Sequence, residues 1–114
     1  MGLIVGNEQN VVTLSIDGGD YTQENAYVSI QPEIAFDRDQ NMLRFSVKVN
    51  KTKQDKLDGK KRINTDDINP MYTLPCTVAE LDAETGNALF VVAYAKLKAK
   101  LLEKWPNKVF DDLP

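Results

Sequence analysis

Few residues of this 114-residue chain have the types and spacing that catalysis or metal binding requires. It has no histidine, so it lacks the usual general base and the commonest metal ligand. Its single cysteine, Cys76, excludes an internal disulfide and a cysteine cluster for zinc. Cys76 could act as a nucleophile only beside a helix N-terminus or a lysine, and it falls on the apolar side of a predicted strand. We therefore interpret it as a buried core residue.

One group of acidic residues has a spacing that resembles a metal site. Asp37-x-Asp39-x-Asn41 matches the opening of a calcium-binding loop. The loop then needs glycine at its sixth position and glutamate at its twelfth, where this chain has Met42 and Lys48. A solvated hairpin turn explains the segment better than a calcium site.

Asp17 and Asp20 flank two glycines and could form a pair of catalytic carboxylates. General acid–base catalysis needs one of them to have a pKa raised by burial, whereas a Gly-Gly turn is usually exposed. The sequence also lacks the Gly-x-Ser-x-Gly, phosphate-loop and dinucleotide-binding fingerprints. We therefore predict that the protein is not an enzyme and has no catalytic, cofactor or metal site.

The composition is that of one ordinary folded domain. Hydrophobic residues make up 42% of the chain and charged residues 27%, with a formal net charge of −3. A chain of this length can bury its own core, so we predict a single domain over residues 1–114. No apolar run approaches the ~20 residues of a membrane helix, and the start lacks the basic region and length of a signal peptide. We expect synthesis in a cytosol and no contact with a membrane.

Four runs with the two-residue period of half-buried strands predict an antiparallel sheet. They cover residues 11–16, 27–36, 42–50 and 71–80. The second and third runs form a β-hairpin around a polar turn. Pro32 cannot donate to a sheet ladder, so the second run must be an edge strand or contain a bulge there.

Three shorter segments are open to two interpretations. Residues 3–5 are either a further strand or a docking arm. Thr77-x-x-Glu80 matches a capping box that opens a short helix, although we favour a continuation of the fourth strand because Gly86 would end a helix so soon. The tail, residues 106–114, carries apolar residues that can dock back on the protein or onto a neighbour.

Residues 87–105 are predicted to form one long helix. Alanine, leucine and lysine dominate the segment, Asn87 is a favourable N-cap, and Pro106 ends it. Its apolar stripe consists of Phe90, Tyr94, Leu97, Leu101 and Trp105. We expect the first four to meet Ile30, Ile34, Phe45 and Val47 of the hairpin, with the alternative that part of the stripe faces another subunit. The pattern predicts an α+β fold, a small antiparallel hairpin-based sheet with one long C-terminal helix.

A basic stretch lies inside the predicted loop 51–70. Residues 51–62 contain six basic and two acidic residues, and their charge of +4 and the −7 of the remaining chain together give −3. No aromatic residue is interleaved for base stacking, so we consider nucleic acid a poor candidate and expect a partner-facing or solvated loop that orders only when bound. The candidate interface residues are Lys51, Lys53, Lys56, Lys60, Lys61, Arg62, Trp105 and Phe110.

Two stretches that cover about half the chain together resemble small structural proteins of tailed bacteriophages and prophages. The first is similar to a hairpin that leads into a basic loop containing Gly-Lys, here Gly59-Lys60. Its motifs are Tyr27-Val28-Ser29-Ile30, Phe36-Asp37-Arg38-Asp39 and Phe45-Ser46-Val47-Lys48-Val49-Asn50-Lys51-Thr52-Lys53. The second resembles an Ala-Tyr-x-x-Leu-Lys helix and an Asp-ending tail. Its motifs are Ala93-Tyr94-Ala95-Lys96-Leu97-Lys98 and Phe110-Asp111-Asp112.

The resemblance implies a virion structural or assembly protein that acts through protein–protein contacts, with no catalytic residues to carry over. It implies other phage structural proteins as partners and multiple copies in a symmetric assembly of the tail, baseplate, neck or capsid. The protein would be made in the host bacterial cytoplasm and end in the virion. The residues leave open a small cytosolic bacterial binding or regulatory module, and, less well supported, a small hydrolase or transferase that uses carboxylates.

Overall fold

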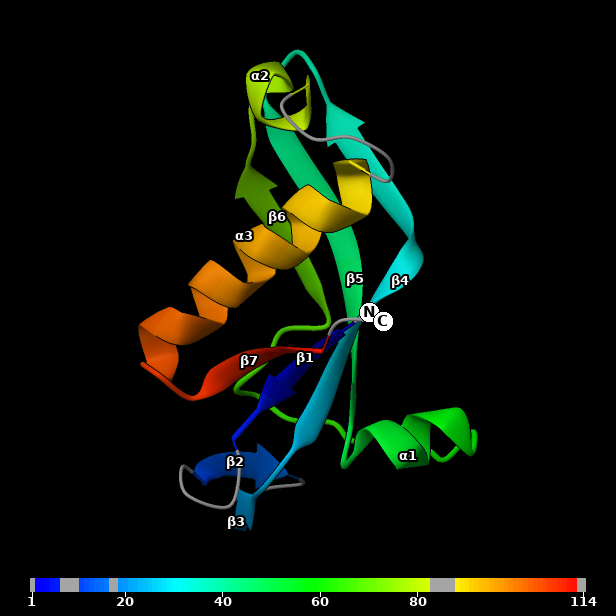
Figure 1. Ribbon diagram of the computed structural model, residues 1–114, viewed down its shortest axis with the longest axis vertical. Helices are drawn as coiled ribbons and strands as arrows, with labels where there is room; N and C mark the ends of the chain where they lie inside the picture. The colour runs from blue at the N-terminus through cyan, green and yellow to red at the C-terminus, as the bar shows by residue number, and fades with distance from the viewer. Residues whose placement is uncertain (1, 7–10, 17–18, 83–87, 113–114) are drawn as a thin grey trace.

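The structure is a computed structural model that describes residues 2–6, 11–16, 19–82 and 88–112 (Figure 1). In chain order its elements are β1 (Gly2–Val5), β2 (Val12–Ile16), β3 (Gly19–Gln23), β4 (Ala26–Asp37), β5 (Met42–Asn50), α1 (Lys53–Leu57), β6 (Met71–Pro75), α2 (Val78–Asp82), α3 (Ala88–Lys104) and β7 (Val109–Asp112). An antiparallel sheet with one long C-terminal helix is present, so the predicted α+β fold is confirmed.

Five strands form the main sheet in the order β6-β5-β4-β1-β7, and β2 and β3 form a separate hairpin. β1 lies between β4 and β7, with Leu3 opposite Val28 on one side and opposite Asp111 on the other. Of the two interpretations of residues 3–5, the strand is therefore right. The C-terminal tail docks back on the protein, where β7 forms one edge of the sheet.

β4 and β5 form the predicted hairpin, and Pro32 lies in a bulge within it. Ile30 pairs with Val47 and Ile34 pairs with Phe45, so three residues of β4 oppose a single residue of β5 between these pairs. A bulge leaves residues out of the ladder, which suits a residue without an N–H group. The bulge interpretation of Pro32 is confirmed.

The edge of β4 next to this bulge is closed by α3 rather than by a strand. β1 pairs with β4 only as far as Val28. The N–H of Ile30 donates to the hydroxyl of Tyr94 on α3 at 2.9 Å, and this hydrogen bond is buried. Pro32 follows without an N–H to offer. Both features reduce what another strand could pair with along this edge.

α3 crosses one face of the sheet and closes the core (Figure 1). Of the eight residues predicted to meet there, six are buried, namely Ile30, Phe45, Val47, Tyr94, Leu97 and Leu101. Ile34 and Phe90 are half-buried and pack against the same cluster. The rings of Phe45 and Tyr72 stack with their centroids 6.0 Å apart. The hydrophobic periodicity therefore predicts both sides of the core correctly, the one on the β4–β5 hairpin and the one on α3.

The predicted strand over residues 71–80 is too long. β6 ends at Pro75, and α2 follows it. The hydroxyl of Thr77 accepts a hydrogen bond from the N–H of Glu80 at 3.3 Å. The capping-box alternative therefore describes this stretch, and the preference for a continuous strand is wrong.

Two further element predictions need correction. The predicted loop 51–70 contains α1, and Gly19 and Asp20, which we predicted in a turn, begin β3. Residues 17–18 and the predicted N-cap Asn87 lie outside the described residues. Within the described ranges, no helix has the length and apolar character needed to cross a membrane.

Candidate interaction surface

The basic stretch forms a short helix with a cap at each end. Thr52 is the N-cap of α1, and its hydroxyl accepts a hydrogen bond from the N–H of Asp55 at 3.0 Å. Gly59, with φ +71°, donates its N–H to the carbonyl of Lys56 at 3.1 Å. The N–H of Lys60 donates to the carbonyl of Asp55 at 2.9 Å. This pair of hydrogen bonds is a Schellman motif, which favours glycine at its left-handed position.

Two of the six basic residues attach α1 to the sheet. The Nζ of Lys53 lies 2.9 Å from the Oδ2 of Asp112 on β7. The Nζ of Lys56 lies 5.4 Å from the ring centre of Tyr27 on β4. Tyr27 donates its hydroxyl to the same Asp112 oxygen at 3.0 Å. Lys53 and Lys56 are therefore engaged within the molecule.

The protonation states of this attachment follow from its burial and contacts. Burial, followed by the contact with Asp112, raises the pKa of Tyr27 to about 12. The hydrogen bond from Lys53, followed by that from Tyr27, outweighs partial burial and lowers the pKa of Asp112. At neutral pH the cluster therefore holds a neutral phenol and a carboxylate beside an ammonium group.

The remaining four basic residues form what we call the basic surface, which consists of Lys51, Lys60, Lys61 and Arg62. All four are exposed, and none of them makes an ion pair with any residue that the structure describes. The side chain of the buried Asn50 donates to the carbonyl of Lys60 at 3.3 Å and so holds the backbone of this surface. Figure 1 shows α1 projecting from the lower end of the sheet, where a partner can reach it.

The two apolar residues of the candidate interface are not part of the basic surface. Trp105 is only 8% exposed and belongs to the core, with the Nζ of Lys104 5.4 Å from its ring centre. Phe110 is half-buried on β7, opposite Ile4. The burial of Trp105 removes it from the interface, because the helix stripe continues into the core for one residue beyond α3.

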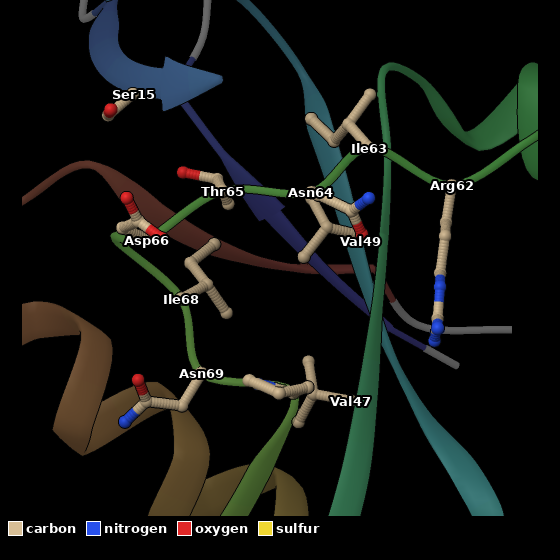
Figure 2. A pocket seen from close by; sticks show the side chains of 11 residues that line it. Ser15, Val47, Val49, Arg62, Ile63, Asn64, Thr65, Asp66, Ile68 and Asn69 are labelled. Carbon is tan, nitrogen blue, oxygen red and sulfur yellow. The ribbon is translucent and has the colours of Figure 1, made fainter. Parts of the chain in front are cut away.

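A cavity of about 420 Å³ lies beside the basic surface, under an arch formed by residues 64–69 (Figure 2). The arch begins where the N–H of Ile63 donates to the carbonyl of Val49 at 2.9 Å. It ends where the carbonyl of Pro70 accepts from the N–H of Val47 at 2.8 Å. The cavity is lined by Ser15, Val47, Val49, Arg62, Ile63, Asn64, Thr65, Asp66, Ile68, Asn69 and Pro70.

Asp67 attaches this arch to α3 and to β2. Its Oδ1 accepts from the Nζ of Lys104 at 2.5 Å. Its Oδ2 accepts from the N–H of Ser15 at 2.6 Å and from the hydroxyl of Thr65 at 3.3 Å. Burial alone would raise the pKa of this carboxyl, but Lys104 and then Ser15 lower it below its usual range. The sequence pattern does not indicate a role for Asp67, because its hydrogen-bond partners Ser15 and Lys104 lie 52 and 37 residues away in the chain.

The other sequence candidates have ordinary structural surroundings. Cys76 is buried at the end of β6, as predicted, and burial, followed by the contact with Glu80, raises the pKa of its thiol. Asp37 accepts a hydrogen bond from the N–H of Asp39 at 2.9 Å, within the polar hairpin turn. Of the paired carboxylates, Asp20 is exposed. In the described part of the chain, no three acidic or cysteine side chains gather as metal ligands would.

Comparison of the chain with family models, with curated proteins and with solved structures finds no match. The geometry of the basic surface nevertheless indicates what it can do. Four exposed cations on a capped and attached segment can bind an anionic surface through charge. Since α1 is already folded, the binding free energy does not have to offset the ordering of a loop. This differs from our expectation of a loop without regular structure before binding.

Proposed function

We propose that the protein is a structural or assembly subunit of a bacteriophage particle, and that it acts through protein–protein contacts without catalysis. The observation that carries the proposal is the basic surface, four exposed cations on an attached segment of an otherwise acidic chain. The resemblance to small phage structural proteins supports the virion as the setting, after synthesis in the bacterial cytoplasm. Its partners are other virion proteins in a repeating assembly.

The surroundings of the basic surface favour a protein partner over nucleic acid. Base stacking needs an accessible aromatic ring, but Tyr27, which lies below Lys56, is only 2% exposed. A cluster of cations without stacking rings suits an acidic protein surface, where charge sets the orientation and speeds the encounter.

Incorporation of charge-reversal variants into particles tests this proposal. Lys60→Glu, Lys61→Glu and Arg62→Glu are combined, because single exposed charges contribute under about 1 kcal/mol each. We expect the amount of protein in purified particles, measured by mass spectrometry, to fall at least tenfold. Lys100→Glu, an exposed change on α3, should leave incorporation unchanged.

The stability of the isolated triple variant is the second measurement. Its thermal midpoint should stay close to that of the unmodified protein, because the three side chains make no ion pair with a described residue. Normal incorporation of a stably folded triple variant would reject the interface. Absence of the unmodified protein from particles would reject the virion role and leave the small cytosolic binding module.

A further inference from the structure

The charges of this chain are divided along the sequence in a way that bears on its partner. All fourteen basic residues follow residue 37, whereas residues 1–37 contain six acidic residues and no basic one. The segment up to residue 37 includes β1 to β4. The segment that forms β1 to β4 is therefore purely acidic in its own charged side chains, although Lys108 reaches the carbonyl of Val11 beside β2.

Two exposed acidic residues lie at the β2–β3 hairpin, which, together with Glu24 directly after β3, we call the acidic hairpin. Asp20 and Glu24 are both exposed there, and neither makes an ion pair with a described residue. Tyr21 lies between them in the sequence and is 53% exposed. Tyrosine is one of the residue types enriched among the residues that contribute most to binding in protein interfaces.

The acidic hairpin, like the basic surface, is attached to the rest of the molecule. The buried side chains of Val12 and Leu14 join it to the core. Its backbone is held by the hydrogen bond from Ser15 to Asp67 and by a bridge between Ile16 and Thr65. A partner therefore meets a formed hairpin, so contact does not require ordering of the strands.

The basic surface carries a matching apolar residue. Leu57, in the last turn of α1, is 68% exposed. In the sequence it lies between Lys51, which precedes α1, and the three cations of the basic surface that follow it. Each surface thus combines an exposed apolar side chain with charges of one sign, and the signs are opposite.

The two surfaces do not pair within one molecule. Figure 1 shows β2 and β3 on one side of the lower end of the protein and α1 on the other side. None of the ion pairs among the described residues joins them. Their charges can therefore be matched only between molecules.

We propose that the basic surface of one molecule binds the acidic hairpin of a second copy of this chain. Two different surfaces meet in such a contact, so a bound pair keeps one free surface of each kind, to which further copies can bind. Repetition of a contact of this type gives a ring if the rotation closes and an open filament if it does not. This inference rests on the proposed function, because it names the partner of the same basic surface.

The test is a charge-swap experiment with three forms of the protein. One variant combines Lys60→Glu with Lys61→Glu, and the other combines Asp20→Lys with Glu24→Lys. Sedimentation velocity at about 0.1 M salt should show concentration-dependent association of the unmodified protein beyond a dimer. The association should weaken at least tenfold at about 1 M salt, where the Debye length is only about 3 Å. Each variant alone should sediment as a monomer.

An equimolar mixture of the two variants gives the decisive result. The reversed acidic hairpin of one variant then matches the reversed basic surface of the other, so association should return. The matched control combines Glu33→Lys with Asp39→Lys. It reverses two exposed acidic residues outside the acidic hairpin, so this variant should associate normally. Tyr21→Ser and Leu57→Ser should each weaken association without changing its salt dependence.

Several outcomes would overturn this inference. The first is a mixture of the two variants that stays monomeric. The second is an unmodified protein that stays monomeric at about 0.1 M salt, or that associates no further than a dimer. The third is an unmodified protein that binds a DNA oligonucleotide through Lys60 and Lys61 instead of a second copy. Incorporation of the two variants into phage particles distinguishes failure of this inference from failure of the proposed function. If the acidic-hairpin variant is incorporated normally and the basic-surface variant is not, the partner is another virion protein, and only the inference about the second copy fails.

Discussion

Single side chains of this protein serve as attachment points whose contacts cross long stretches of sequence. Tyr27 is the clearest case, since its hydroxyl meets Asp112 and its ring lies beneath Lys56. It also fixes the residue at position 2, because a Cβ added to Gly2 would overlap the Tyr27 ring. The local sequence pattern predicts none of these contacts of Tyr27. It does predict the alternation of apolar residues that buries one face of the β4–β5 hairpin.

The raised pKa of Tyr27 predicts a loss of stability in alkali. The folded protein keeps this phenol neutral up to about pH 12, whereas an unfolded chain ionises it from about pH 10. Its contribution is therefore complete below about pH 10 and decreases as the pH rises toward 12. Denaturant midpoints measured across this range should fall, and Tyr27→Phe should reduce the slope. Tyr94, whose pKa burial also raises, should leave a residual slope.

The lowered pKa of Asp67 predicts the opposite dependence in acid. Its carboxylate is stabilised in the folded state, so its contribution is complete above the unfolded value near 4 and decreases as the pH falls through the lower folded value. Asp67→Asn should reduce stability by about 1–3 kcal/mol at neutral pH, and the difference from the unmodified protein should shrink in acid. Equal destabilisation at every pH would contradict this. Lys104→Met is the control, with a smaller effect because Lys104 is half exposed.

Phe45 tests the predicted core most directly. It is only 1% exposed and stacks with Tyr72, so Phe45→Ala should lower the free energy of unfolding by about 3–5 kcal/mol. A denaturant titration measures this change. A loss below about 1 kcal/mol would mean that the side chain does not contribute to the core as its burial indicates.

At the scale of elements, the sequence predicts long periodic segments well and short ones poorly. The β4–β5 hairpin and α3 were found because each repeats its apolar period several times. The pattern does not predict β3, because most of its residues are polar. It predicts only a tail where β7 lies, because four residues contain just two repeats of the strand period. Long-range pairing, rather than propensity, decides such strands.

α1 could have been predicted from its caps. Thr52 stands three residues before Asp55, and Gly59 follows the helix at the position that a Schellman motif needs. The spacing of apolar residues does not indicate α1, because the segment contains too few of them to show a helical period. Two of the six cations attach α1, and the other four make no ion pair with a described residue. This division depends on Tyr27 and Asp112, which no local signal indicates.

Gly59 provides a test of how α1 ends. Its φ of +71° is unfavourable for a residue with a Cβ, while the space around it is open. Gly59→Ala should therefore destabilise the protein by about 1 kcal/mol through backbone strain alone. Gly59→Asn should be milder, because asparagine tolerates the left-handed region better. Thermal unfolding of the two variants checks the order, and equal midpoints for Ala and Gly would show that the motif is not needed.

At the scale of the whole molecule, the charge division was visible in the sequence but its arrangement was not. The +4 of residues 51–62 indicates a basic stretch, and four of its six cations form the basic surface. Its position relative to the β2–β3 hairpin depends on how the sheet orders its strands, which the sequence pattern left open. Trp105 shows the same limit, since the apolar stripe that includes it favours covering the sheet but leaves open that part of it faces a neighbouring subunit, whereas the structure buries Trp105 in the core.

The place of β1 in the sheet has a consequence for the order in which the chain can fold. β1 is made before every other described element, yet one of its two neighbours in the sheet, β7, is the last described element to be made. Until then one side of β1 has unpaired backbone groups, and Tyr27 lacks its carboxylate partner Asp112. A nascent chain must therefore wait for β7 before the sheet closes, and this late pairing of segments so far apart in the sequence makes slow folding the expected behaviour.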